Sequence, residues 1–257
     1  MKLNLFLARC GISSRRKASD LIKNGRVQVN GKVVTEPYHR VNDEDKVAVD
    51  GKAVSPKKFV YVMLNKPRGY TCTLKDRFAK LKVTDLLPES LGRVFPVGRL
   101  DKESCGLLIL TNDGDFAQRL THPRYQVEKE YEVSVRPQFN PKDTGVLKKG
   151  IIDAGERLSL CGLKVLRTGP EGSKISVVLK EGRKREIRRI FFALGYRVSS
   201  LKRTRIGNVT LESLPSGKYR YLSETEISRL SDKTFYPDRE EELLCYTRKT
   251  LMRQESA

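Results

Sequence analysis

The first apolar stripes of the chain predict two short helices. A run over residues 5–10, ended by Gly11, indicates the first helix. After Ser13 and Ser14, either of which can cap a helix N-terminus, apolar residues recur at the i, i+3, i+4 spacing of one helix face, at Ala18, Leu21 and Ile22. We therefore expect a second helix that ends near Asn24-Gly25.

A change from helical to alternating periodicity follows at once. Val27 and Val29 alternate with polar residues up to Asn30-Gly31, and Val33-Val34 come directly after that pair. Asn-Gly between two alternating runs is a strong signal for a two-residue hairpin turn. The N-terminal region is thus predicted to be a compact module of two helices and a hairpin.

The longer second region is richer in strands than in helices. Strand-like runs occur at residues 59–64, 107–110, 131–135, 163–166, 175–179 and 219–222. Helices are expected near residues 116–120 and 186–194, and in the second of these Ile187, Ile190, Phe191 and Leu194 form a buried stripe. Strands and helices do not alternate regularly, which favours a mixed α+β fold over a doubly wound sheet.

These patterns divide the chain of 257 residues into four parts. We predict a first domain at residues 1–48, a linker at 49–58 that contains Pro56, a second domain at 59–231, and a polar extension at 232–257. The extension carries three consecutive glutamates and is expected to be an appended helix or a loose segment.

The net charge points to a polyanionic partner. Lys and Arg number 51 against 31 Asp and Glu, a formal charge of +20, and the first 58 residues alone hold 13 basic and 6 acidic residues. Such an excess disfavours the compact state unless a polyanion is bound, and nucleic acid is the favoured partner. A membrane surface is disfavoured because no apolar run approaches a spanning length and no basic amphipathic anchor is present.

Cysteine and histidine usage argues against metal chemistry. The five cysteines are scattered without a CxxC pair, and only two histidines are present, so neither a metal site nor a disulfide framework is expected. Reduced thiols and a start without a secretory apolar region predict a cytoplasmic protein. No glycine-rich dinucleotide or phosphate loop occurs, so no cofactor is expected.

The N-terminal module resembles a known RNA-binding domain. The run FLARCGISSRRKASDLIKNGRVQVNGKVV is similar to the small domain of the ribosomal protein S-four type, which has two helices and a hairpin. Basic residues at the start of the second helix oppose its dipole, which suggests a use in binding phosphates. The resemblance implies RNA contacts at Arg15, Arg16, Lys17, Arg26, Asn30 and Lys32.

The second domain contains a distinctive segment, GRLDKESCGLLILTNDG, at residues 98–114. It resembles the catalytic motif of pseudouridine synthases that modify ribosomal RNA, whose domain is built on a mixed, mostly antiparallel sheet. The resemblance implies that Asp101 is the catalytic carboxylate. Ser104 stands where threonine is more familiar in this family, and a hydroxyl is retained. From spacing alone, Asp101 would read as an ordinary turn residue.

Three further segments resemble motifs of the same family. NKPRG at residues 65–69 is similar to its opening signature, and EKEYEV at 128–133 to the motif whose tyrosine, here Tyr131, stacks on the target base. EGRKREIRR at 181–189 is similar to the motif whose basic residue, here Arg188, pairs with the aspartate. With the N-terminal module, the resemblance spans about residues 1–230.

Each implied role has a structural alternative. Arg188 could contact a phosphate, because residues 174–205 hold 11 basic and 2 acidic residues, and RNA contacts are also predicted at Arg183, Lys184, Arg185 and Arg189. Tyr131 could fill the core of a strand. Arg99 could fill the gap that a flipped-out base leaves in the RNA, as the resemblance implies, or it could hold the loop by backbone hydrogen bonds.

The chemistry explains the need for these groups. Isomerising uridine to pseudouridine changes no oxidation state and needs no cofactor, and an extruded base regains stacking on an aromatic face. Arg188 would lower the pKa of a partly dry Asp101 carboxyl. Asp101 could attack the ribose, add to the uracil, or deprotonate the sugar, and the sequence leaves all three open.

We therefore predict a monomeric enzyme that forms pseudouridine in ribosomal RNA. The form of the catalytic segment favours the large subunit, near the peptidyl-transferase region, by resemblance alone. The main alternative is a non-catalytic RNA-binding factor of ribosome assembly, which would not need Asp101, Tyr131 and Arg188 together.

Overall fold

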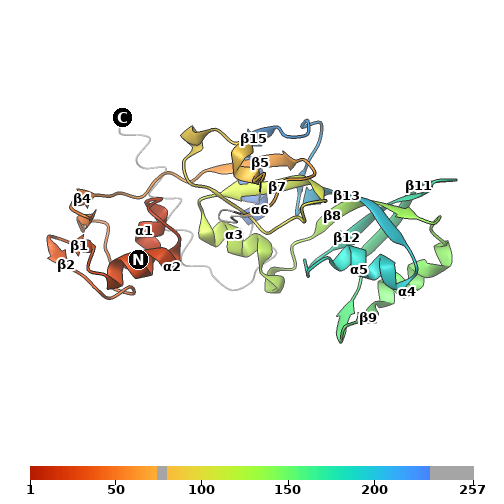
Figure 1. The fold of residues 1–257 in the computed structure, drawn as a ribbon, viewed down its shortest axis with the longest axis horizontal. Coiled ribbons are helices and arrows are strands. Elements are labelled where there is room, and N and C mark those ends of the chain that lie inside the picture. The colour runs from red at the N-terminus through yellow and green to blue at the C-terminus, as the bar shows by residue number, and fades with distance from the viewer. Residues whose placement is uncertain (74–79, 232–257) are drawn as a thin grey trace. The chain divides into compact units, whose positions relative to one another are not determined.

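The structure is a computed structural model that describes residues 1–73 and 80–231, shown as a ribbon in Figure 1. The chain divides into two compact units. Unit 1 comprises Met1–Ala117 and Ser213–Leu222, and unit 2 comprises Gln118–Glu212 together with residues 223–231 of the described chain. The predicted polar extension at 232–257 lies outside the described residues. None of the helices in the described ranges is long and apolar enough to cross a membrane.

Unit 1 begins with a small module of two helices and a four-stranded sheet. Its elements are α1 (Leu3–Arg9), α2 (Arg15–Lys23), β1 (Val27–Val29), β2 (Lys32–Val33), β3 (Val47–Val49) and β4 (Lys52–Ala53). The antiparallel strands lie in the order β2-β1-β3-β4. Ser14 caps α2 by accepting a hydrogen bond from the backbone of Lys17, and Ala18 and Ile22 are buried. The predicted helices and hairpin are confirmed.

The sheet of this module runs past residue 48. Strand β3 turns at Asp50-Gly51 into β4, and the backbone N–H of Val54 donates to the carbonyl of Val47 at 2.9 Å. Val54 also packs against the buried core of the module. The first six residues of the predicted linker, 49–54, are therefore part of the module.

The rest of unit 1 is built around two buried strands. Its strands are β5 (Tyr61–Lys66), β6 (Phe95–Pro96), β7 (Cys105–Thr111) and β15 (Tyr219–Tyr221), joined with the 3-10 helices η1 (Val83–Leu86) and η2 (Glu89–Leu91). β5 pairs antiparallel with β7 and β15, and β7 also pairs with β6. The apolar run at 107–110 is fully buried, as expected of a strand covered on both faces.

One predicted boundary in unit 1 is wrong. The first strand of this domain was predicted at residues 59–64, but β5 continues through Asn65 and Lys66. Asn65 donates from its side-chain amide to the carbonyl of Leu214 at 2.7 Å, and the Lys66 ammonium also finds carbonyl partners. These polar side chains stay in a buried strand because other segments supply acceptors.

Unit 2 contains an antiparallel sheet flanked by short helices. Its main strands are β8 (Lys129–Arg136), β11 (Gly162–Gly169), β12 (Gly172–Leu179), β13 (Arg197–Ile206) and β14 (Val209–Thr210). β8 lies between β12 and β13, with β11 beside β12 and β14 beside β13. The predicted strands at 131–135, 163–166 and 175–179 are confirmed, and the α+β class holds.

The remaining elements of the described chain are short. They are α3 (Gly114–Thr121), η3 (Pro123–Tyr125), η4 (Pro141–Asp143), α4 (Thr144–Lys149), β9 (Ile151–Asp153), β10 (Glu156–Leu158), α5 (Glu186–Ala193) and α6 (Glu224–Ser231). β9 and β10 form a separate two-stranded hairpin, and α5 packs against β9 and β13. In α5 the predicted apolar stripe is buried at Ile187, Ile190 and Phe191.

Candidate active site

Asp101 lies in unit 1, in the short loop that leads into β7. The buried side chain of Leu100 precedes it, and Asp101 itself is half-buried. The backbone N–H of Ser104 donates to the carbonyl of Asp101 at 3.0 Å, which closes a turn. The N–H of Gly69 donates to the carbonyl of Lys102 at 2.8 Å and joins this turn to the segment after β5. The carboxylate is therefore carried on a well-defined backbone.

A buried lysine holds the same turn from inside the protein. Lys66, the last residue of β5, has 0% of its surface exposed. Its ammonium donates to the carbonyls of Ser104 at 2.7 Å, Pro67 at 3.0 Å and Lys102 at 3.3 Å. Two of these carbonyls lie on the residues that follow Asp101. Lys66 thus acts on Asp101 by positioning its backbone.

Lys66 was not among the site residues predicted from the sequence. The sequence nevertheless contains a sign of its role. A lysine at the end of an apolar strand and before a proline must either interrupt the strand or find buried acceptors. Burial lowers the pKa of Lys66, and nearby groups, including the Asp101 carboxyl, oppose that shift. The ammonium remains the species that can donate to three carbonyls at once.

Arg68 and Cys72 complete the support of the loop. The Nε of Arg68 donates to the carbonyl of Glu103 at 3.1 Å, and the backbone N–H of Leu100 donates to the Sγ of Cys72 at 3.4 Å. Arg99, in contrast, is exposed. Lys66, Arg68 and Cys72 therefore hold the loop by hydrogen bonds, and the Arg99 side chain lies on the surface.

Tyr131 lies in the middle of β8 in unit 2. Only 6% of its surface is exposed, and the guanidinium of Arg203, in β13, lies over its ring at 6.0 Å from the centroid. The two residues are direct neighbours in the β8–β13 register, and Arg203 is also buried. A cation over an aromatic face stabilises the arrangement and fixes the orientation of the ring.

Arg188 is bound to the same strand, β13. It lies in the first turn of α5, is half-buried, and donates from Nη1 to the carbonyl of Val198 at 3.0 Å. Tyr131 and Arg188 are thus both attached to β13 within unit 2. Asp101 belongs to unit 1, so its approach to these two residues is part of the proposal below.

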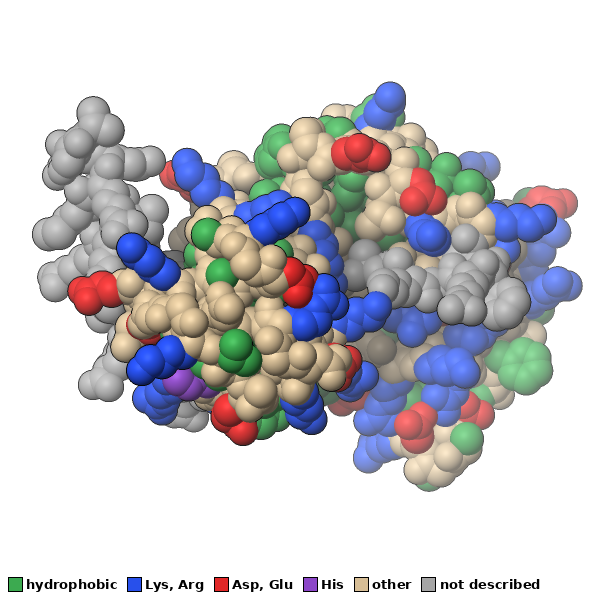
Figure 2. All heavy atoms as spheres, turned by 60° about the vertical axis from the view of Figure 1, so that its left-hand side comes forward, with side chains coloured by type: hydrophobic (Ala, Val, Ile, Leu, Met, Phe, Trp, Pro, Cys, Tyr) green, Lys and Arg blue, Asp and Glu red, His purple; other side chains and the backbone are tan. Residues whose placement is uncertain are grey.

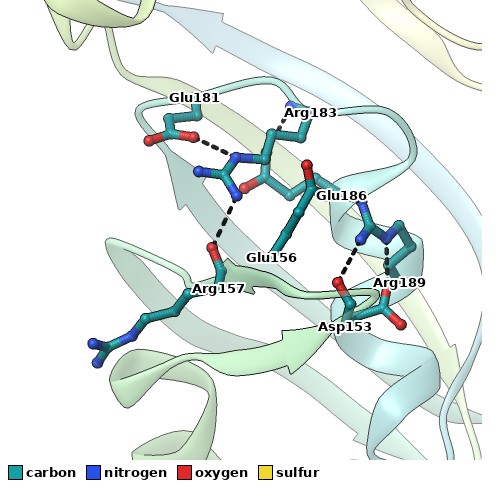
Figure 3. A network of polar contacts seen from close by, with 7 residues as sticks. All are labelled: Asp153, Glu156, Arg157, Glu181, Arg183, Glu186 and Arg189. Carbon is teal, nitrogen blue, oxygen red and sulfur yellow. Dashed lines mark hydrogen bonds and ion pairs between the residues drawn. The ribbon is translucent and has the colours of Figure 1, made fainter.

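Two of the predicted RNA contacts on and before α5 have partners within the protein, as Figure 3 shows. Arg189 pairs with Asp153 and, at 2.7 Å, with Glu156, both on the β9–β10 hairpin. Arg183 pairs with Glu181 at 2.7 Å, and these carboxylates raise the pKa of both arginines. These two arginines therefore anchor the helix and its leading loop.

Two other basic residues of this segment are open to solvent. Lys184 and Arg185 lie directly before α5 and are exposed. A polyanion can approach them without first breaking the ion pairs of Arg183 and Arg189. Of the four RNA contacts predicted here, Lys184 and Arg185 are placed best for phosphates.

The N-terminal module exposes all six residues predicted to contact RNA. Arg26 pairs with Asp50, and the Asn30 side chain bonds Asp45 at 2.7 Å and the backbone N–H of Lys46 at 2.9 Å, so both also stabilise the hairpins. The first turn of α2 holds no acidic residue, which leaves three consecutive basic side chains at its start, Arg15, Arg16 and Lys17. Lys and Arg side chains are prominent on the face seen in Figure 2.

A cavity of about 390 Å³ in unit 2 is separate from the Tyr131 ring. Glu130 and Glu132 of β8 line it, with Lys202 and Thr204 of β13. Successive residues of a strand point to opposite faces, so this cavity lies across the sheet from Tyr131. Within residues 1–73 and 80–231, no cluster of His, Cys, Asp or Glu is arranged to hold a metal ion.

Known proteins match both parts of this chain. The family model described as RNA pseudouridylate synthase matches residues 60–193, and the S4 domain model matches residues 1–47. Ribosomal large subunit pseudouridine synthase B of Bacillus subtilis (strain 168) is 39% identical over 232 residues, which cover 89% of this chain and 95% of the relative. An uncharacterized RNA pseudouridine synthase of Aquifex aeolicus (strain VF5) is 39% identical over 90% of this chain and 93% of its own.

A solved structure described as pseudouridylate synthase aligns with a TM-score of 0.64 and 29% identity, covering 90% of this chain and 99% of its own. The chain therefore belongs to the RNA pseudouridylate synthase family.

Proposed function

We propose that this protein converts a specific uridine of large-subunit ribosomal RNA to pseudouridine, with Asp101 as the catalytic carboxylate. The observation that carries the proposal is the Asp101 turn, whose carbonyls are held by the buried Lys66 ammonium. A carboxylate on a backbone fixed from inside the protein is what a reaction on one ribose carbon requires. The named activity of the Bacillus subtilis relative supports the large subunit as the source of the substrate.

In the proposed reaction one bond breaks and another forms at the same ribose carbon. The bond to nitrogen 1 of uracil is cleaved, the ring turns, and carbon 5 is joined to the ribose. Carbon 5 loses a proton and nitrogen 1 gains one, so no atom or electron is supplied from outside. Asp101 attacks the ribose, adds to the uracil, or removes a ribose proton, and each of these roles needs its ionised form.

Arg188 and Tyr131 have supporting roles in this proposal. The guanidinium of Arg188, which stays charged near neutral pH, would pair with Asp101 and orient the carboxylate. Tyr131 would stack on the extruded uracil and recover about 1–3 kcal/mol of the cost of flipping. Burial of Tyr131 under Arg203 supports a ring that is already oriented before RNA binds.

Substitution of the carboxylate tests the proposal. In Asp101→Asn we expect pseudouridine formation to fall below detection while RNA affinity is retained, because the amide keeps the shape of the side chain and loses its charge. Pseudouridine is mapped by carbodiimide-blocked primer extension on large-subunit ribosomal RNA incubated with either protein. Asp115→Asn, an exposed carboxylate at the start of α3, is the matched control and should retain full activity.

Two results would reject parts of the proposal. Turnover by Asp101→Asn at the rate of the unsubstituted protein would remove Asp101 from the reaction. Tight RNA binding by the unsubstituted protein without any pseudouridine would instead identify a non-catalytic factor of ribosome assembly.

A further inference from the structure

Helix α5 presents an aromatic ring to solvent. Phe192, in its last turn, has 78% of its surface exposed, whereas the neighbouring Phe191 is completely buried. A single exposed apolar side chain is common on protein surfaces and needs no explanation by itself. The surroundings of Phe192 distinguish it from such a case.

The segment of the chain that contains Phe192 is rich in positive charge. Residues 183–197 hold six Lys and Arg and one acidic residue, Glu186. Glu186 is buried, and its carboxylate accepts a hydrogen bond from the backbone N–H of Arg183 at 2.9 Å. Arg188 and Arg189 precede Phe192 by four and three residues, and side chains at these spacings lie on the same side of a helix.

The helix that carries Phe192 is held rigidly. Its buried face packs through Ile187, Ile190 and Phe191, and the Arg189 side chain attaches it to Asp153 and Glu156 of the β9–β10 hairpin (Figure 3). A ring on such a helix is held near its binding position before a ligand arrives, so binding orders little of the protein.

Aromatic rings among basic groups are the usual arrangement for binding unpaired nucleic acid. Bases stack on the ring while Lys and Arg contact the phosphates on either side. We propose that Phe192 is a stacking platform for an unpaired base of the RNA substrate, with Arg185 and Lys184 as phosphate contacts. This proposal rests on the proposed function only in naming the RNA, since its test measures binding and not turnover.

The absence of tryptophan from the chain allows a direct test. Phe192→Trp places the single tryptophan of the chain at the platform, where it can be excited selectively, and stacking of a base on it should quench its emission. The titrant is an oligouridylate of about ten nucleotides, long enough to cover one binding surface. Inorganic polyphosphate has the charge without the bases and should bind without quenching the emission.

Ile152 provides a matched control. It is 79% exposed on β9, and its neighbour Asp153 faces Arg189, so the Ile152 side chain points away from α5. Ile152→Trp should keep its emission when oligouridylate is added. Equal quenching in both variants would show general proximity to RNA and would overturn the stacking role of Phe192.

Truncation of the ring gives the energetic test. Phe192→Ala should weaken oligouridylate binding about 5- to 150-fold, and Phe192→Tyr should restore it. Ile152→Ala should leave the affinity unchanged. The slope of affinity against salt concentration should be the same in all four proteins, because a base stacked on a ring releases no counterions.

The outcomes separate this inference from the proposed function. Unchanged affinity in Phe192→Ala, or a reduced salt slope, would overturn the platform whether or not the protein makes pseudouridine. If the unsubstituted protein makes no pseudouridine but the quenching and the affinity loss are observed, the platform stands and the proposed reaction falls. If the Phe192 ring binds a protein and not RNA, Phe192→Ala will retain its full affinity for oligouridylate.

Discussion

The loop that carries Asp101 is anchored from inside unit 1, whereas helix α5, which carries Arg188, is anchored from the surface of unit 2. Lys66 is completely buried and donates to three backbone carbonyls. Arg189 forms its ion pairs with side chains that are 40% and 47% exposed. Hydrogen bonds from a buried charge are strong and shielded from salt, whereas exposed ion pairs contribute little and are screened.

The difference indicates that the two anchors serve different needs. A catalytic carboxylate must be placed with small tolerance relative to one ribose carbon. Helix α5 is already placed by its buried apolar face, so its surface ion pairs add little to its position and leave Lys184 and Arg185 exposed to phosphates. Substitutions in the two regions should therefore have unequal effects.

The largest effect is expected for Lys66→Met. Loss of the ammonium leaves buried carbonyls without donors, and we expect unfolding free energy to fall by about 2–4 kcal/mol, with loss of pseudouridine formation. Urea unfolding and primer extension measure the two effects. Lys58→Met, an exposed lysine shortly before β5, should unfold like the unsubstituted protein. A stable, fully active Lys66→Met would show that the turn holds its own shape.

An intermediate effect is expected at Lys129, a partly buried lysine whose pKa is also lowered. Burial, aided by the charge of Arg203, lowers its pKa from 10.5 to about 8, and its ammonium donates to the carbonyl of Val127 at 2.9 Å. Between pH 8 and 10.5 the unfolded chain binds more protons at this group than the folded protein does. Stability should therefore rise with pH across that window through this group.

The comparison with Lys129→Met isolates this contribution. The urea midpoint of the unsubstituted protein minus that of the variant should increase from pH 8 to 10.5. Other groups titrate in both proteins and cancel in the difference. A constant difference across this range would mean that Lys129 has an ordinary pKa.

The smallest effect is expected for Arg189→Gln. Its ion pairs are partly exposed, so we expect a small decrease in the urea midpoint that disappears at about 1 M sodium chloride, where charges are screened within about 3 Å. The loss in Lys66→Met should persist at the same salt concentration. A salt-independent loss in Arg189→Gln would indicate that packing of the arginine stem, and not its charge, attaches α5 to the hairpin.

Much of the fold was accessible from local patterns. The Asn30-Gly31 turn forms as predicted, and Asn30 takes the left-handed backbone conformation that a two-residue turn requires. The buried strand at residues 107–110 and the apolar stripe of α5 are likewise consequences of side-chain periodicity. Such features depend on residues close together in the chain, so their signal can be read without a structure.

Strand β13 was not predicted, because its formation depends on residues that are far apart in the chain. Its sequence, RVSSLKRTRI, has no clear alternation of apolar and polar residues, and its register with β8 shifts twice. It becomes a strand because β8 offers a partner along its length, and because Arg203 can be buried over the ring of Tyr131. Pairing between distant segments overrides a weak local preference.

The candidate site divides in the same way. The sequence alone determined the chemical groups: a carboxylate at Asp101, an aromatic at Tyr131 and a guanidinium at Arg188, in motifs long enough to identify the family. Tertiary structure alone decided that Lys66 would support the Asp101 turn, since its acceptors lie up to 38 residues away. Periodicity reports which side chains prefer burial, but only the folded chain determines which distant carbonyl or carboxylate satisfies a buried or anchoring charge.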